Sequence, residues 1–256
     1  MSIVTIGLIS VSDISKIETM NILNLFKLKE EKKKEKKKYI SYNQRIIDHL
    51  AARGFKRKNM NFFVRKINED ITQSIIFGHS TQGRAHAKYY DVRVCIELPK
   101  VLKTAKELDI PISRVALFSS NIGELMNPSS YLEWLVTEDS SESYDNGVVD
   151  SILEHIDRYA IPLLDKLCTV SSIVEGIKKR GLPGRYGDNM HACIALLLYG
   201  EKKDFFWFVE QRSYEMQFSI YDQEAHWDYR NPGVPLNKIC KSFLDMVDKL
   251  EPLWNT

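Results

Sequence analysis

The stretch NFFVRKINEDITQSIIFGHS at residues 61–80, followed by YYDVRVCIEL at 89–98, decides the fold class. Both segments are rich in Phe, Ile, Val and Tyr, the residue types that favour strands. In the second segment two sets of side chains alternate: Val92, Val94, Ile96 and Leu98 against Asp91, Arg93, Cys95 and Glu97. Such alternation predicts an antiparallel strand with one face in the core and one face in water.

Turn residues separate the expected strands. The Asn-Glu-Asp sequence at 68–70 lies between strands expected at 61–67 and 71–77, which predicts a hairpin. The polar segment 78–88 is longer and is expected to be a surface loop that leads into the strand at 89–98.

Helical signals flank these strands. A helix capped by Ser41 and stopped at Gly54 is expected before them, and a helix over 99–108 that begins with proline is expected after them. Apolar segments at 115–118 and 131–136 predict two further strands.

The second half of the chain follows an acidic loop expected at 139–146 and is helical in character. Apolar residues at helical spacing predict helices at 148–167, 170–180, 189–199, 204–218 and 236–250. Pro162 is expected to kink or divide the first of them. The order predicts an α+β fold with an N-terminal helix, an antiparallel sheet of about five strands and a C-terminal helical half. We expect one globular domain over 41–256, with a sheet part at 41–138 and a helical part at 145–256.

A lysine-rich segment precedes this domain, and we interpret residues 1–40 as an appendage in which Met20 is a second candidate initiator. Residues 27–38 carry +5, and because the net charge is +2, the rest of the chain carries −3. A mildly acidic body argues against a nucleic-acid enzyme, and we expect no nucleic-acid partner. Residues 22–38 would suit contact with an anionic membrane surface, although a solvated helix or linker is the favoured interpretation.

Cysteine usage and hydropathy bear on the compartment. The four cysteines are far apart and form no CxxC pair: Cys95, Cys168, Cys193 and Cys240. This spacing argues against a zinc ribbon and against a disulfide scaffold. No segment approaches the roughly 20 apolar residues of a membrane-spanning helix, and residues 1–11 lack the positive region of a secretory signal. We therefore expect a cytoplasmic protein with reduced thiols.

Motifs for metal and phosphate chemistry are weak. His191 and Cys193 are the one close histidine and cysteine pair in the sequence, but on a helix they point about 200° apart. We therefore expect no metal site. The glycine-containing sequence GLPGRYGD at 181–188 lacks the GK[ST] ending of a phosphate-binding loop, and we expect no cofactor.

Catalytic signals are also weak, and we assign no catalytic residue. The sequence has no GxSxG nucleophile elbow. An enzyme whose site assembles only in three dimensions remains an alternative, with candidates in the loop and on the wet face of the sheet: His79, Arg84, His86, Asp91 and Glu97.

Two surfaces are candidates for contact with a protein partner. The first is the polar loop, and the second is an aromatic, acidic stretch near the C-terminus, where exposed Tyr and Trp would serve as interface anchors. The candidate residues are His79, Arg84, His86, Tyr221, Trp227 and Tyr229. An acidic and aromatic surface would suit the basic active site of a toxin.

Four blocks carry a resemblance to a known family: RIIDHLAARGFKRKNMNFFVRK at 45–66, ITQSIIFGHS, YYDVRVCIEL, and HIDRYAIPLLDKL at 155–167. Over residues 41–218 the chain resembles family 4304 of uncharacterised bacterial domains of unknown function. The resemblance implies an α+β fold without catalytic residues, and similar domains occur among toxin-immunity proteins. The preferred hypothesis is therefore a non-enzymatic cytoplasmic protein that neutralises a bacterial toxin by occluding it. An enzyme and a membrane-surface adaptor are the alternatives.

Overall fold

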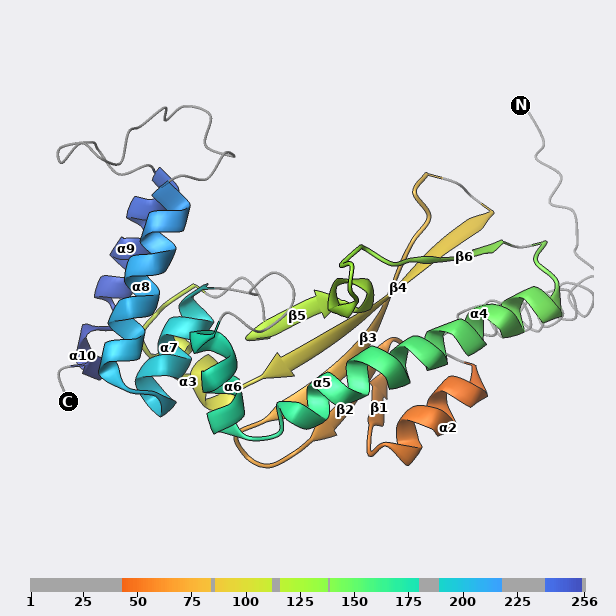
Figure 1. Ribbon diagram of the computed structural model, residues 1–256, viewed down its shortest axis with the longest axis horizontal. Helices are drawn as coiled ribbons and strands as arrows, with labels where there is room; N and C mark the ends of the chain where they lie inside the picture. Colours follow the sequence, from red (N-terminus) through yellow and green to blue (C-terminus); the bar gives the residue numbers. More distant parts are fainter. Residues whose placement is uncertain are drawn as a thin grey trace, which may run out of the picture.

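The computed structural model describes residues 43–83, 86–111, 116–137, 139–179, 189–217 and 238–254. Its strands are β1 (Lys56–Asn59), β2 (Phe62–Lys66), β3 (Thr72–Ser80), β4 (Ala87–Glu97), β5 (Phe118–Asn121) and β6 (Trp134–Thr137). Its helices are α2 (Gln44–Ala52), α3 (Pro99–Glu107), α4 (Glu142–His155), α5 (Ile161–Lys166), α6 (Val170–Lys178), α7 (Asn189–Tyr199), α8 (Lys202–Gln217), α9 (Lys238–Asp248) and α10 (Glu251–Trp254). The α+β fold is confirmed. Figure 1 shows the sheet with α2, α4 and α5 in one part of the molecule and the other helices in a second part.

The strands form one antiparallel sheet in the order β1-β2-β3-β4-β5, with β6 also paired to β4. β5 and β6 share one edge of β4: β5 pairs with Arg93 to Ile96, and β6 pairs with Ala87 to Tyr90. Together they occupy the place of a single long strand, interrupted by the insertion at 122–133.

One face of the sheet forms the core. Phe63, Ile75 and Val94 lie side by side in the register and are at most 1% exposed. α5 covers this face, because the Gln73 side-chain amide donates hydrogen bonds to the carbonyls of Leu164 and Leu167, at 2.6 and 3.2 Å. On the opposite face Phe62, Val64 and Ile76 are only partly buried. The predicted alternation of two faces is present, but the second face is only partly wet: Asp91 and Cys95, which were expected in water, are buried at 6% and 2% exposure.

α2 begins two residues later than expected. Asn43, not Ser41, is its N-cap, and the Asn43 side chain accepts a hydrogen bond from the Arg45 amide at 2.9 Å. The helix stops where predicted, at Gly54, whose φ of +82° is a left-handed conformation that glycine adopts without strain.

The β2–β3 hairpin is confirmed. The Asn68 side chain accepts hydrogen bonds from the amides of Asp70 and Ile71, both at 2.9 Å, and so closes the turn. β1 was not predicted, because its sequence KRKN has no apolar residue to show alternation. Charged residues of this kind are common on edge strands, which they protect from pairing with other chains.

The long loop predicted at 78–88 is shorter in the structure. Gly78, His79 and Ser80 extend β3 and pair with Asp91, Tyr90 and Tyr89 of β4. The connecting segment is 81–86. The sequence Gly-His-Ser at 78–80 has no apolar residue that would indicate a strand, and it is a strand because its backbone pairs with β4.

The strand expected at 115–118 begins only at Phe118, and the strand expected at 131–136 is β6. A 3₁₀ turn, Ile122–Leu125, starts the insertion between them. The Asn121 side chain holds both ends of the insertion, accepting hydrogen bonds from the amides of Gly123 and Leu132, each at 2.9 Å.

The prediction of an acidic loop at 139–146 is wrong over most of that range, because α4 begins at Glu142. The Ser141 side chain caps the helix by accepting a hydrogen bond from the Tyr144 amide at 3.2 Å. Acidic side chains in a first helical turn are stabilised by the helix dipole, so an acidic sequence here favours the helix. Pro162 divides the long helix as predicted: a π-helical turn, Ile156–Ala160, separates α4 from α5.

In the described residues, the predicted helices of the second half are present, and α10 is an addition. α7 is buried along most of its length, including Cys193 and Ile194 at 0% exposure. α3 lies against α7 and connects the sheet to the helical half. Residues from both halves, such as Ile75 and Ile194, belong to one continuous hydrophobic core.

Candidate functional site

The end of the β3–β4 hairpin carries two of the predicted partner-binding residues, His79 and His86, and both are exposed. β2 pairs with β3 only as far as Ile76, so β3 runs past the end of β2. The Gln82 side-chain amide donates a 3.0 Å hydrogen bond to the carboxylate of Glu133, in the insertion before β6. This bond anchors the connecting segment to the sheet. Sequence reasoning missed it, because the two residues are 51 positions apart.

An acidic surface adjoins this hairpin end. Thr137 of β6 pairs with Ala87, which brings the start of α4 next to the connecting segment. Asp139 and Glu142 are exposed there. Tyr144 is 49% exposed, and its hydroxyl donates a 3.0 Å hydrogen bond to the Leu135 carbonyl, which fixes the ring. We call these residues, with His79 and His86, the hairpin-end surface.

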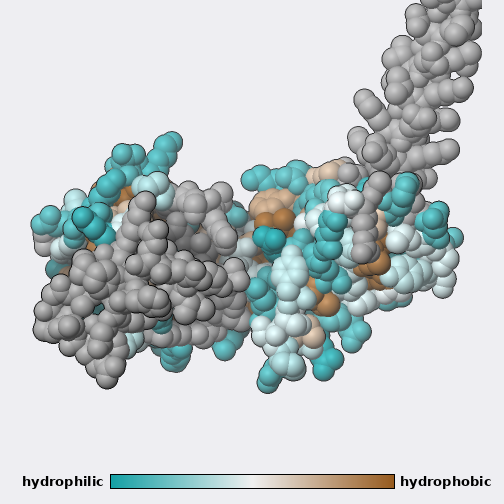
Figure 2. Space-filling model, turned by 90° about the horizontal axis from the view of Figure 1, so that it is seen from above, coloured by the Kyte–Doolittle hydropathy of each residue, from teal (hydrophilic) through white to brown (hydrophobic). Residues whose placement is uncertain are grey.

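Figure 2 looks at the molecule from above, the side toward which the hairpin end projects in Figure 1. In the coloured part of that view hydrophobic colour appears only in small areas between hydrophilic side chains. Recognition at this side would therefore depend on polar groups and single aromatic rings rather than on a broad apolar patch.

The other predicted contact residues lie outside the described residues: Arg84, Tyr221, Trp227 and Tyr229. The same is true of the segment 22–38 that was considered for a membrane surface and of the glycine-containing stretch 181–188.

The residues proposed for an enzyme site do not gather in one place. His79 and Asp91 belong to opposite faces of the sheet, because His79 pairs with Tyr90 and Gly78 pairs with Asp91. Glu97 lies six residues further along β4, which corresponds to roughly 20 Å of strand. No shared site forms from those of the candidates that the structure describes.

A buried carboxylate orients an arginine on the wetter face of the sheet. Arg93 Nε lies 2.7 Å from Asp91 Oδ2, and the Asp91 side chain is only 8% exposed, while that of Arg93 is 50% exposed. Gly78 makes room for the carboxylate, since a Cβ there would lie 1.8 Å from Asp91 Oδ1. The hydrogen bond that Arg93 donates to Asp91 raises the pKa of Arg93. Burial, followed by the charge of Asp91, raises the pKa of the nearby Tyr131 hydroxyl.

Next to this pair lies a group of small polar side chains. Cys95 Sγ is 3.4 Å from Ser119 Oγ, and burial raises the pKa of the Cys95 thiol to about 11. Burial also raises the pKa of Glu97, with the charge of Lys58 opposing the shift. A thiol in this protonation state is a poor nucleophile at neutral pH.

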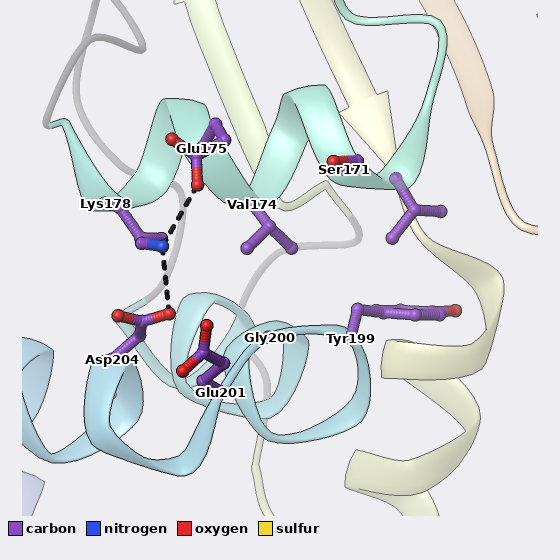
Figure 3. Close-up of a pocket in the computed structure, with 9 residues that line it drawn as sticks. Ser171, Val174, Glu175, Lys178, Tyr199, Gly200, Glu201 and Asp204 are labelled. Atoms are coloured by element: carbon purple, nitrogen blue, oxygen red, sulfur yellow. Dashed lines mark ion pairs between the residues drawn. The ribbon is translucent and has the colours of Figure 1, made fainter.

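A pocket of about 420 Å³ lies between α6 and the α7–α8 connection (Figure 3). Val174 and the ring of Tyr199 line its apolar part. On the polar side Lys178 Nζ bridges Glu175 and Asp204, at 3.0 and 3.1 Å. These pairs neutralise the charges of the wall and join α6 to α8. None of the candidate site residues named in the sequence analysis lines this pocket. Lys178 and Glu175 are close in the sequence, but Asp204 belongs to another helix, so the sequence alone could not show that these three side chains meet.

Within the described part of the chain, no three His, Cys, Asp or Glu side chains form a group that could hold a metal ion. Nor does any helix within those ranges combine the length and apolar composition needed to cross a bilayer. The four cysteines are free thiols.

Comparison of the chain with protein-family models, with curated proteins and with solved structures gave no match.

Proposed function

We propose that the chain is a non-enzymatic protein-binding domain of the bacterial cytoplasm that neutralises a toxin by covering its active site. The resemblance to bacterial domain family 4304 is part of this proposal. The observation that carries it is the hairpin-end surface, in which His79 and His86 are presented on a hairpin anchored by Gln82 and Glu133. Binding residues are commonly found on connecting segments that a rigid sheet positions.

The chemistry of the neighbouring residues supports a basic partner. Asp139 and Glu142 are exposed beside the hairpin end, and the fixed ring of Tyr144 is half exposed. Tyrosine is enriched at interfaces because its ring contributes area and its hydroxyl contributes a hydrogen bond. Complementary charge steers association and rejects wrong partners. The separation of His79, Asp91 and Glu97 gives further weight to binding over catalysis.

The test is an affinity purification of the tagged chain from its native cell and with the products of adjacent genes, read by mass spectrometry. We expect one stoichiometric basic protein, whose toxicity on expression is suppressed by this chain. Glu142→Lys combined with His86→Ala should weaken the complex by at least about tenfold, in the range of an interface hot spot.

Glu107→Lys is the matched control, because Glu107 is an exposed carboxylate on α3, away from the hairpin end (Figure 1). It should leave the complex unchanged. Recovery of no protein partner with intact bait, or equal loss of affinity in both variants, would overturn the proposal.

A further inference from the structure

The wetter face of the sheet carries a second surface, distinct in charge from the hairpin end. Its residues share the face of the sheet opposite α5, as the strand register and side-chain contacts place them. We call it the basic sheet face, and it consists of Lys56, Lys58, Phe62, Val64, Lys66, Ile76, Arg93 and Glu97. Phe62, Val64 and Ile76 are partly buried and form its apolar centre.

Positive charge on this face exceeds negative charge among the described residues, although Arg93 pairs with Asp91 and the charge of Lys58 acts on Glu97. Lys56, Lys58 and Lys66 are exposed and make no ion pair with any described residue. Arg93 donates Nε–H to Asp91 and also hydrogen-bonds the Tyr131 hydroxyl, and these two bonds do not use all five N–H donors of its guanidinium. Among the described residues of this face, the acidic side chains are Glu97 and Asp91. Four cations therefore face two carboxylates, one of which is buried beneath Arg93.

The register and one ring contact arrange two of the cations at the ends of a row across four strands, in which Asn59 of β1 pairs with Phe62 and the neighbouring Lys58 reaches the Phe62 ring. Phe62 pairs with Ile76, and Ile76 pairs with Arg93. The Lys58 ammonium lies 5.8 Å from the centroid of the Phe62 ring, at the β1 end of the same row. With strands about 4.8 Å apart, the row spans roughly 14 Å. It reads cation, aromatic, aliphatic, cation.

We propose that the basic sheet face binds an acidic, extended protein segment whose carboxylates reach Lys58 and Arg93 while its apolar side chains cover Phe62 and Ile76. Asp91 acts as a positioning residue, since together with the Tyr131 hydroxyl it holds the Arg93 guanidinium, whose remaining N–H donors meet a carboxylate.

The observations favour a peptide over a nucleic acid. The excess of positive charge on the face is small, which matches the few carboxylates of a short peptide better than the continuous charge of a nucleic acid. Phe62 is the one ring of the apolar centre, and Val64 and Ile76 are aliphatic, so the centre has no series of rings on which successive bases would stack. Apolar side chains between carboxylates match the apolar centre and its basic rim better than a regular phosphate backbone.

The test uses a fluorescein-labelled peptide of alternating aspartate and leucine, about eight residues long so that it can cross the sheet. Fluorescence anisotropy with the full-length chain should show binding that weakens with added salt. Arg93→Gln and Lys58→Gln should each weaken it about fivefold, the loss of one charge pair. Glu97→Gln should strengthen it, because it removes a repulsive carboxylate.

Lys103→Gln is the control, because Lys103 is an exposed lysine of α3 and not of the sheet. It should leave peptide binding unchanged, and circular dichroism should show that every variant is folded. Oligothymidylate is the competing probe. The proposal is overturned if the peptide does not bind, if Lys103→Gln weakens it as much as Arg93→Gln, or if oligothymidylate binds with the same dependence on Arg93 and Lys58. Since Arg93→Gln leaves the hairpin-end surface unaltered, this test fails or succeeds independently of the proposed toxin complex.

Discussion

Gln73 is a fully buried polar side chain whose hydrogen bonds join the sheet to the C-terminal end of α5. Its amide nitrogen donates to the carbonyls of Leu164 and Leu167, and its oxygen accepts from Arg65 Nε at 2.9 Å. Arg65 in turn lies 4.8 Å from the Phe55 ring and pairs with Asp165 at 2.6 Å. One glutamine thus satisfies the backbone at a helix end and orients an arginine.

Replacing Gln73 by leucine should destabilise the protein by about 1–3 kcal/mol, because the buried carbonyls and Arg65 lose partners that water cannot replace. Urea unfolding followed by circular dichroism measures the change. Gln44→Leu is the control, since Gln44 is an exposed glutamine that bonds only Asp48 within its own helix. A similar small change in both variants would contradict the role given to Gln73.

Glu97 predicts a dependence of stability on pH. Burial raises its pKa in the folded state above the unfolded value, so the folded protein favours the protonated form. The resulting stability is present below the unfolded pKa and is lost as the pH rises through the raised pKa. Glu97→Gln should therefore increase the free energy of unfolding at pH 7 more than at pH 4. An equal effect at both pH values would show that the carboxylate is not penalised by burial.

At the scale of elements, the start of α4 differs most from expectation and is the most direct to test. Ser141→Ala removes the side chain that accepts the Tyr144 amide and should cost about 1 kcal/mol. Thermal unfolding measures the loss, with Ser171→Ala as the control, because Ser171 is an exposed residue of α6 and caps no helix. If Ser141→Ala has no effect, α4 would instead begin near Val148, as its apolar periodicity predicts.

The elements that the sequence predicted well are those with a periodic apolar pattern. β2, β4, α3 and α7 fall close to their expected bounds because each buries a face or its whole surface. β1 and the end of β3 could not be predicted, because KRKN and GHS show no apolar alternation and are held as strands by backbone pairing to a neighbour. Such pairing is a tertiary property, invisible in a local window.

The candidate surfaces were predictable to a smaller degree. His79 and His86 could be chosen because a polar segment between strands is normally exposed. The contacts that shape the surfaces could not be predicted. Gln82 meets Glu133 because β4 pairs with β6, and Gly78 meets Asp91 because β3 pairs with β4. The basic sheet face needed the register too, because β1 was not recognised as a strand.

At the scale of the whole molecule, the continuous core predicts that the sheet and the helical half unfold together. Trp134 belongs to the sheet, while Trp254 packs against Phe205 with ring centroids 5.3 Å apart in the helical half. The variant Trp134→Phe should therefore report on the second half by fluorescence. A variant with Trp207, Trp227 and Trp254 all changed to Phe should report on the sheet.

In each variant, the unfolding midpoint measured by fluorescence should coincide with the midpoint measured by circular dichroism, as a two-state transition requires. Two separated midpoints would mean that the contact of α3 with α7 does not couple the halves.

The shared edge of β4 also has a use in engineering. Since β5 and β6 occupy one strand position, the insertion 122–133 leaves the sheet and returns to it at adjacent points on the same neighbour. Asn121 ties its entry to its exit. A foreign peptide that replaced the middle of this insertion would be displayed with both ends fixed by β-pairing, at a small cost in loop-closure entropy. The interrupted strand therefore makes this domain a scaffold on which a constrained loop can be exchanged without altering the order of the sheet.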